Sequence, residues 1–369
     1  MSKRDISPRK AIKKFSPYVP GKSIEEVKEE YGLKEVIKLA SNENLWGTSS
    51  RAIERIKKEL DRLYLYPQSE PVLLKRALSK KFNISADSFI AGNGTDEIIE
   101  LIAKTFLSEK DKMLISKNSF IRYKMGGILM GAKVVEVPQN KLRIDLEKIF
   151  KKIDNETKLI FIDNPCNPTG TFVSESEIKE FISKIEKLEI PPLVVFDEAY
   201  YEYADSNSYD SAVKLLDRNV PLMVLRTFSK IYGLAGLRIG YGISSPGIIS
   251  LIDRIRPPFN TNRLAQAAAL GALEDYEFIA KINSRISEEK EYLYGELKEL
   301  DLEYVESQTN FILVKFGKEI VESLCEHLLK NGIILRPLKG YSLDDYIRIT
   351  VGKGQQNEKL ISCIREFLS

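Results

Sequence analysis

Residues 193–198 read LVVFDE, an unbroken apolar run that ends in two acidic residues. A run without polar alternation is typical of a strand that is buried on both faces of a parallel sheet. Stretches of helical periodicity separate it from similar runs rich in β-branched residues. The expected strands span residues 88–92, 112–116, 133–138, 158–163, 193–198, 221–228 and 237–244. This order predicts an α/β fold with a mostly parallel seven-stranded sheet covered by helices.

The stretches between these runs carry helix signals. Residues 52–63 space their apolar side chains along one helical face, and Ser174 begins a capping-box signature for a helix that reaches about Leu188. After about residue 270 longer helices and shorter strands indicate a smaller α+β domain. We expect an N-terminal arm that packs with the small domain, a large domain and a small C-terminal domain, at residues 1–44, 45–270 and 271–369.

The composition is that of an ordinary globular protein, with 43% hydrophobic and 30% charged residues among 369. The net charge of only +3 predicts no nucleic-acid partner, because such partners normally require a basic stripe. No apolar run approaches the length of a membrane span, and no signal-peptide pattern opens the sequence. Three widely separated cysteines argue against a disulfide framework and fit a reducing compartment, so we expect a cytoplasmic location.

The sequence holds one histidine, His327, which lies in the amphipathic stretch SLCEHLLK. The spacing places it on a helix surface, far from any nucleophile motif. A Ser-His-Asp hydrolase and a multi-histidine metal site are therefore both excluded, and we expect no metal. If the protein is an enzyme, its proton transfers must use Lys, Tyr, Asp or Glu.

Polar side chains cluster where the predicted strands end, which is the edge where doubly wound sheets bind ligands. The turn Gly92–Glu97 joins a strand to a helix N-terminus, and its converging N–H groups favour a phosphate. A capped glycine turn is equally common as a purely structural device. The turn Asp163–Gly170, with two Asx-Pro-type steps, can hold the Asn167 amide toward a ligand or can simply be rigid.

Two further strand ends carry charge. Asp197 ends a wholly apolar strand, so its carboxylate needs a cationic or hydrogen-bonded partner, such as a protonated pyridine nitrogen. A helix N-cap is the alternative role. Lys230 also follows an apolar strand, and a desolvated lysine has a lowered pKa and a nucleophilic amine. Ser229 and Arg238 flank it with a hydroxyl and a guanidinium that suit a phosphate.

Together these segments resemble the fold-type-I pyridoxal-phosphate aminotransferases, and most closely the histidinol-phosphate aminotransferase group. The resemblance covers nearly the whole chain in one ordered series. The matching segments are FSPYVPGKSIEEV (15–27), KLASNEN (38–44), LYPQ (65–68), RPPFNTNRLAQ (256–266), TNFILV (309–314), GIILRPL (332–338) and IRITVG (347–352).

The resemblance implies pyridoxal 5'-phosphate as cofactor and a role for each matching residue. Lys230 would bind the cofactor as a Schiff base and act as the acid/base of the proton shift. Asp197 would pair with the pyridine nitrogen, and Tyr200 and Asn167 would hydrogen-bond the ring hydroxyl oxygen. The residues implied around the cofactor phosphate are Gly94, Thr95, Asp96, Ser229 and Arg238.

The resemblance also implies partners and a substrate side. Tyr66 would reach the cofactor phosphate of the other subunit, which predicts a two-fold homodimer with shared active sites. Phe120 would stack on the pyridine ring, and Arg348 would bind the substrate carboxylate. The residues implied on the substrate side are Tyr18, Asn44 and Arg336.

The sequence departs from the group's pattern at three places. Phe120 is not preceded by the usual proline, and Cys166 stands where the group has Asn. Leu45-Trp46-Gly47 replaces the more usual Pro-Leu-Gly, so Trp46 either reshapes the substrate pocket or serves as a packing residue.

The leading hypothesis is transamination between histidinol phosphate and the 2-oxo acid 2-oxoglutarate, in histidine biosynthesis. The alternative is an aminotransferase for aromatic or other α-amino acids, which Trp46 and Phe120 would favour. A third hypothesis is that the protein is a threonine-phosphate decarboxylase. A ligand sensor fused to a DNA-binding domain is disfavoured, because no helix-turn-helix pattern precedes the domain.

Overall fold

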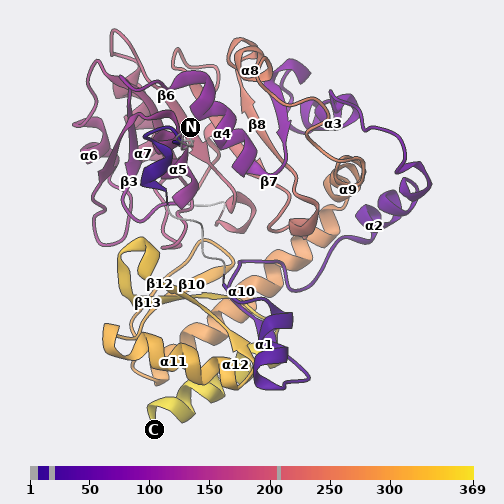
Figure 1. Cartoon of the computed structure of the whole chain (residues 1–369), viewed down its shortest axis with the longest axis vertical. Coiled ribbons are helices and arrows are strands. Elements are labelled where there is room, and N and C mark those ends of the chain that lie inside the picture. Colours follow the sequence, from indigo (N-terminus) through magenta and orange to yellow (C-terminus); the bar gives the residue numbers. More distant parts are fainter. Residues whose placement is uncertain (1–6, 16–20, 206–208) are drawn as a thin grey trace, which may run out of the picture.

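A computed structural model describes residues 7–15, 21–205 and 209–369 of the chain. Figure 1 shows a larger part, which contains a seven-stranded sheet, above a smaller part that contains the C-terminus. The long helix α10 (Tyr276–Glu299) runs from one part into the other. In the described part of the chain no helix combines the length and the apolar character needed to cross a membrane.

The seven-stranded sheet has the strand order β2-β8-β7-β6-β5-β3-β4, and only β8 runs antiparallel to its neighbours. The prediction of a mostly parallel seven-stranded sheet is therefore confirmed. Every residue of the central strands β6 and β7 is buried, as expected for strands that are covered on both faces of the sheet. The strands are β2 (Phe89–Gly92), β3 (Lys112–Ser116), β4 (Lys133–Val137), β5 (Thr157–Asp163), β6 (Leu193–Asp197), β7 (Leu222–Thr227) and β8 (Gly240–Ser244).

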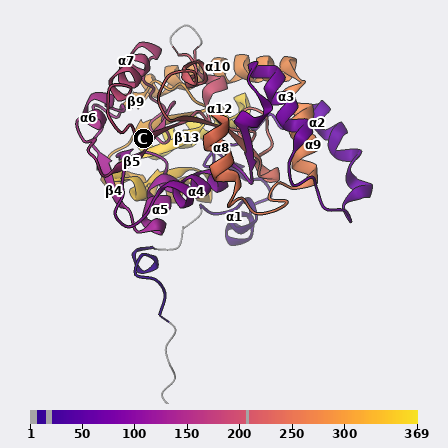
Figure 2. The ribbon, with the colours of Figure 1, turned by 90° about the horizontal axis from the view of Figure 1, so that it is seen from above.

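Helices cover both faces of this sheet, and alternate residues of each strand supply the two cores. Leu159 and Phe161 of β5 pack with α4 (Thr95–Phe106), α5 (Ile121–Met130) and α8 (Pro246–Asp253). Ile160 and Ile162 point the other way and pack with α6 (Leu146–Phe150) and α7 (Glu175–Ile185). The period of two along the strand therefore decides which residues face which helices. Figure 2 shows these helices around the sheet from above. The other helices of this part are α2 (Ser50–Lys57), α3 (Val72–Phe82) and α9 (Arg263–Leu273).

The smaller part is built on an antiparallel sheet of order β12-β13-β10-β9. The N-terminal segment joins it, because β1 (Ile37–Lys38) pairs in parallel with β11 (Ile333–Ile334). Ser23 and Glu26 form a capping box at the N-terminus of the first helix of this segment. The remaining elements are α1 (Ile24–Tyr31), β9 (Tyr304–Val305), β10 (Phe311–Lys315), α11 (Lys318–Lys330), β12 (Arg336–Leu338), β13 (Leu343–Thr350) and α12 (Gly354–Leu368). The domain boundaries near residues 44 and 270 stay a prediction.

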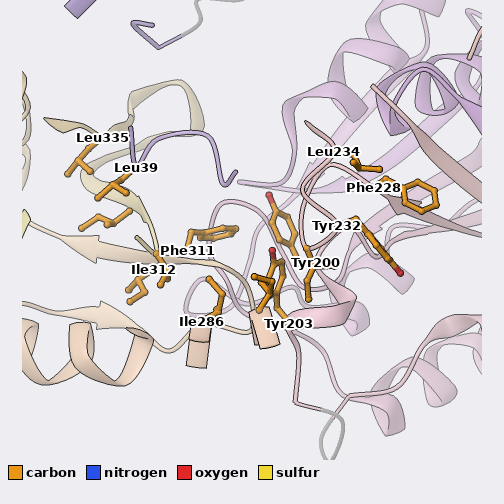
Figure 3. Packing of buried hydrophobic residues seen from close by; sticks show 14 of the residues in the cluster. Leu39, Tyr200, Tyr203, Phe228, Tyr232, Leu234, Ile286, Phe311, Ile312 and Leu335 are labelled. Atoms are coloured by element: carbon orange, nitrogen blue, oxygen red, sulfur yellow. The ribbon is translucent and has the colours of Figure 1, made fainter. Parts of the chain in front are cut away.

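One hydrophobic core crosses from the smaller part into the larger one. Figure 3 shows Phe311 of β10 beside Tyr200, which follows β6 of the large sheet. The two rings meet edge to face with their centroids 5.2 Å apart. Because Tyr200 also follows Asp197 closely in the chain, this core anchors the carboxyl end of β6 against the smaller part.

Several predicted boundaries were wrong, each for a local reason. The helix expected at 52–63 ends at Lys57 and is followed by a 3-10 turn, and much of its apolar face is exposed in this chain. The strand expected at 237–244 begins only at Gly240, because Arg238 has φ +54°. The segment 332–338 contains two short strands, β11 and β12, which belong to different sheets. The capping box at Ser174 is confirmed, although its helix ends at Ile185.

Candidate active site

A cavity of about 330 Å³ lies at the carboxyl ends of β5, β6 and β7. Most of the side chains singled out from the sequence meet there, although their segments lie far apart in the chain. Those that line the cavity are Thr95, Asp96, Phe120, Asn167, Asp197, Tyr200, Ser229, Lys230 and Arg238. Parallel strands bring their carboxyl ends to one edge of the sheet, which explains this convergence.

Lys230 follows β7 and is half-buried, because its amine opens into the cavity. Its Nζ donates a hydrogen bond of 3.3 Å to the Ser41 carbonyl oxygen. Desolvation, aided by the positive charge of Arg348, lowers the pKa of Lys230 to about 8. About a tenth of this amine is therefore neutral and nucleophilic at pH 7, far more than in an ordinary lysine.

Asp197 ends β6 and is 4% exposed. Its Oδ2 accepts a hydrogen bond of 2.8 Å from the Tyr123 hydroxyl, and its Oδ1 accepts one of 3.1 Å from the Ala199 N–H. Burial raises the pKa of Asp197 to about 6. Both hydrogen-bond donors are neutral, so the carboxylate can still accept a cation from the cavity.

Hydrogen bonds from Asn42 and Arg348, which lie outside the large sheet, hold Tyr200 and Asn167 in place. The Tyr200 hydroxyl accepts a 2.8 Å hydrogen bond from the Asn42 amide, and burial raises the pKa of Tyr200 to about 12. The Asn167 Oδ1 accepts a 2.5 Å hydrogen bond from Arg348. Arg348 is buried, and its second guanidinium nitrogen donates to the Ala40 carbonyl at 2.8 Å. The Asn167 NH₂ group is thereby left to face a ligand as a donor.

The groups gathered at the N-terminus of α4 suit an anion, and we call them the anion subsite. Arg238 donates to Ser229 Oγ at 3.4 Å and forms an ion pair with Asp96 at 3.2 Å. Gly94 has φ +75°, and a Cβ there would lie 2.6 Å from the Arg238 guanidinium. Glycine is therefore required at this position so that the guanidinium can lie against the helix N-terminus. Thr95 begins the helix, whose first N–H groups and dipole favour an anion.

The other predicted residues lie away from the cavity lining. Tyr66 is 79% exposed and stacks on Phe259. Asn44 contacts main chain, donating to the Ile231 carbonyl at 2.7 Å and accepting from the Trp46 N–H at 3.1 Å. Arg336 is half-buried and pairs in register with Arg348. Tyr18 lies outside the described residues. The proposed roles of these residues stay predictions.

The sequence reasoning missed several residues that line the cavity. Tyr123 gave no signal, because it lies in the first turn of α5 and not at the end of a strand. Ser41 and Glu43 belong to the quoted segment 38–44 but received no role. Asp163 ends an apolar strand, as Asp197 does, so the same strand-end rule could have identified it.

The geometry assembles three chemical functions in one cavity. A partly neutral amine can condense with an aldehyde, a buried carboxylate can hold a protonated ring nitrogen, and a helix N-terminus with a guanidinium can hold a phosphate. A ligand that carries an aldehyde, a basic ring nitrogen and a phosphate satisfies all three.

Comparison with known proteins gives a consistent result. The model of the family "Aminotransferase class I and II" matches residues 34–364. The chain is 41% identical to a histidinol-phosphate aminotransferase of Moorella thermoacetica, over 98% of this chain and 93% of that protein. It is 44% identical to the enzyme of the same name from Caldicellulosiruptor saccharolyticus, over 98% and 99%.

A solved structure agrees with these relatives. The histidinol-phosphate aminotransferase of Sinorhizobium meliloti, in complex with pyridoxal-5'-phosphate, matches with a TM-score of 0.89 at 26% identity, over 100% of this chain and 98% of that one. The predicted fold type is thereby confirmed. The chain therefore belongs to the class I and II aminotransferases and, among them, to the histidinol-phosphate aminotransferase family.

Proposed function

We propose that this protein uses pyridoxal 5'-phosphate to transfer an amino group from histidinol phosphate to 2-oxoglutarate, yielding imidazole-acetol phosphate and glutamate in histidine biosynthesis. The observation that carries the proposal is the Lys230 amine, whose pKa is lowered to about 8, in the same cavity as the Asp197 carboxylate. Full-length relatives that share the family name support the choice of substrate.

The residues present fit this cofactor. The anion subsite of Ser229, Arg238 and the α4 N-terminus suits its phosphate. Asp197 is hydrogen-bonded only by Tyr123 and a backbone N–H within the described residues, so its negative charge suits a protonated ring nitrogen. When bound, pyridoxal phosphate supplies an electron-accepting ring that stabilises negative charge on the substrate carbon.

The protein's own groups hold and move protons around that ring. The Lys230 Nζ takes the proton from the substrate α-carbon and returns it one position along, as general base and then general acid. Asp197 would keep the ring nitrogen protonated. Tyr200 and Asn167 would hydrogen-bond the ring hydroxyl oxygen, and Asn167 is itself fixed by Arg348. Phe120 packs edge to face on Tyr123 and offers its ring to the cavity.

Substrate binding requires a site that accepts two kinds of anion. Histidinol phosphate carries no carboxylate, whereas 2-oxoglutarate carries two. Arg336 and Arg348 are register partners on β12 and β13, so their side chains leave the sheet at neighbouring positions. We propose that this arginine pair accepts the phosphate in one half-reaction and a carboxylate in the other.

The assay that tests the proposal uses the purified, cofactor-loaded protein with a panel of amino donors. Turnover of histidinol phosphate with 2-oxoglutarate is expected to exceed that of phenylalanine by at least about tenfold. Preferential turnover of phenylalanine would instead establish the aromatic alternative, and release of carbon dioxide from phosphothreonine would establish a decarboxylase.

We further propose that the active unit is a homodimer in which Tyr66 completes the partner's site. Tyr66 lies in an exposed apolar surface that a folded monomer has little reason to present to water. Tyr66 stacks on the exposed Phe259, and the exposed apolar side chains near it in the sequence are Leu60, Leu63, Tyr64 and Leu73.

Subunit mixing tests the shared site. Tyr66→Ala and Lys230→Met homodimers should each have low activity. Mixed dimers should regain activity, because one site then receives Lys230 from one chain and Tyr66 from the other. No gain on mixing, with exchange of subunits verified by mass, would contradict the shared site.

The proposed location is the cytoplasm. Cys166, Cys325 and Cys363 are all free, as a reducing compartment requires. Fractionation of cells that express the tagged protein would test this location.

A further inference from the structure

A second carboxyl group, Asp163, lies beside Asp197 at the end of the neighbouring strand. The two residues are register partners in the parallel pair β5–β6, so their Cα atoms are about 5 Å apart and their side chains leave the same face of the sheet. Residues two positions earlier, Phe161 and Val195, confirm that shared face, because both belong to the core under α4 and α5.

Asp163 is 3% exposed, and it lines the cavity. Its Oδ2 accepts a 2.9 Å hydrogen bond from the Asn167 N–H. Its Oδ1 is buried and has no hydrogen bond of normal geometry in the described part of the chain. A buried carboxyl oxygen without a partner is costly, and it indicates a role that the fold alone does not require.

Besides the Asn167 N–H, the groups that interact with Asp163 are acidic groups of the elements packed against it. They are Asp197 on β6, the Tyr123 hydroxyl on α5, the Cys166 thiol in the following turn and the Tyr200 hydroxyl after β6. The thiol is only a weak donor. Burial, with the charge of Asp197 as a smaller cause, raises the pKa of Asp163 to about 7.

We propose that Asp163 and Asp197 form a two-carboxylate pair, in which Asp163 is a positioning residue that sets the negative charge that Asp197 presents to the cofactor ring. This inference rests on the proposed cofactor site and deepens it. Two carboxyls at this separation ionise in succession, so the pair carries one negative charge at lower pH and two at higher pH. The second negative charge would stabilise the protonated form of the cofactor's ring nitrogen and of the nitrogen that Lys230 contributes.

The first test uses the cofactor-free protein and the isosteric variant Asp163→Asn. A carboxyl whose folded-state pKa is raised costs stability as pH rises from its unfolded value of about 3.9 to its folded value of about 7. The stability advantage of the variant over wild type should therefore grow across this interval, by about 2 °C or more in Tm. A constant difference across this pH range would show a purely structural role and overturn the proposal.

The second test follows the absorbance of the lysine-bound cofactor as a function of pH. In Asp163→Asn the titration should move to lower pH by about one unit and should fit a single site, whereas the wild-type curve should be broader. Cys166→Ala is the matched control, because it changes a buried neighbour of Asp163 without altering charge or adding a hydrogen-bond donor, and its curve should follow wild type. Superimposable curves for Asp163→Asn and wild type would overturn the proposal.

A failure of the carboxylate-pair inference and a failure of the proposed function give different results. A wild-type protein that binds no pyridoxal phosphate contradicts the proposed function. The stability of Asp163→Asn, Asp197→Asn and the double variant as a function of pH still decides whether the carboxyls are coupled, because the effects of uncoupled groups add. If Asp163→Asn does not fold, Asp163→Ser removes the same charge with a smaller side chain, and the same two outcomes apply to it.

Discussion

The two ends of the cavity are built in different ways. The ring end, which we propose holds the cofactor ring nitrogen, uses side chains at the ends of the adjacent strands β5, β6 and β7. The substrate end, which we propose receives the substrate, lies next to Arg348 on β13, and Arg348 contacts the Ala40 carbonyl and Asn167. The first end is set by strand register alone. The second depends on how the two parts of the molecule meet, so changes there should alter substrate binding and leave the cofactor in place.

The largest effect is expected from Lys230→Met, which removes the amine at the ring end. Loss of the nucleophile and of the general acid/base should lower turnover on the order of 10⁴-fold. The absorbance of the lysine-bound cofactor should disappear, which a spectrum of the purified variant measures directly.

Lys290 offers a matched control for that change. It is also buried, and burial lowers its pKa to about 8, but it donates to the Ser307 carbonyl away from the cavity lining. Lys290→Met should keep the absorbance and most of the activity. An equal loss of absorbance and activity in both variants would contradict the role of Lys230 as the residue that binds the cofactor.

Asp197→Asn tests the electrostatics of the ring end. The amide keeps the shape of the carboxylate but loses the charge-assisted bond, which is worth about 1.5–3 kcal/mol. We expect kcat to fall about 10- to 100-fold, with weaker cofactor binding in a dialysis measurement. Unchanged kcat would contradict the pairing with the ring nitrogen.

Arg348→Lys tests the substrate end. Lysine keeps the charge but cannot contact Asn167 and the Ala40 carbonyl together as the planar guanidinium does. The KM for 2-oxoglutarate should rise about tenfold, a loss of about 1.4 kcal/mol, while the cofactor stays bound in a dialysis measurement. Loss of the cofactor with an unchanged KM would show that the two ends are not separable in this way.

The same contrast explains what the sequence could predict. Asp197 and Lys230 were predictable because a charged residue directly after an apolar strand must lie at the ligand-binding edge. The contact between Arg348 and Asn167 was not, because it joins positions 181 residues apart through the packing of two sheets. Tyr123 likewise gave no signal, since its contact with Asp197 depends on where α5 crosses the sheet.

Periodicity also has a limit that the segment 52–63 illustrates. Its apolar spacing is real, but the helix stops at Lys57, and Leu60 and Leu63 beyond it are exposed. A repeat of apolar residues predicts that one face of a helix is buried, but it does not identify the surface that covers this face. The proposed homodimer would supply that surface from a second chain.

The smallest effect expected concerns the pH dependence of cofactor capture at the ring end. Only the neutral amine of Lys230 attacks the aldehyde, so the capture rate should rise with pH and level off above its pKa of about 8. Between pH 7 and pH 8 the neutral fraction grows about fivefold, and an ordinary lysine would instead give a full tenfold increase that continues to about pH 10. Stopped-flow absorbance of cofactor-free protein mixed with pyridoxal phosphate measures this profile. A rate that still rises tenfold per pH unit at pH 9 would show that the cavity does not lower the pKa of Lys230. The ring end would then lack the desolvated amine that distinguishes it from the substrate end.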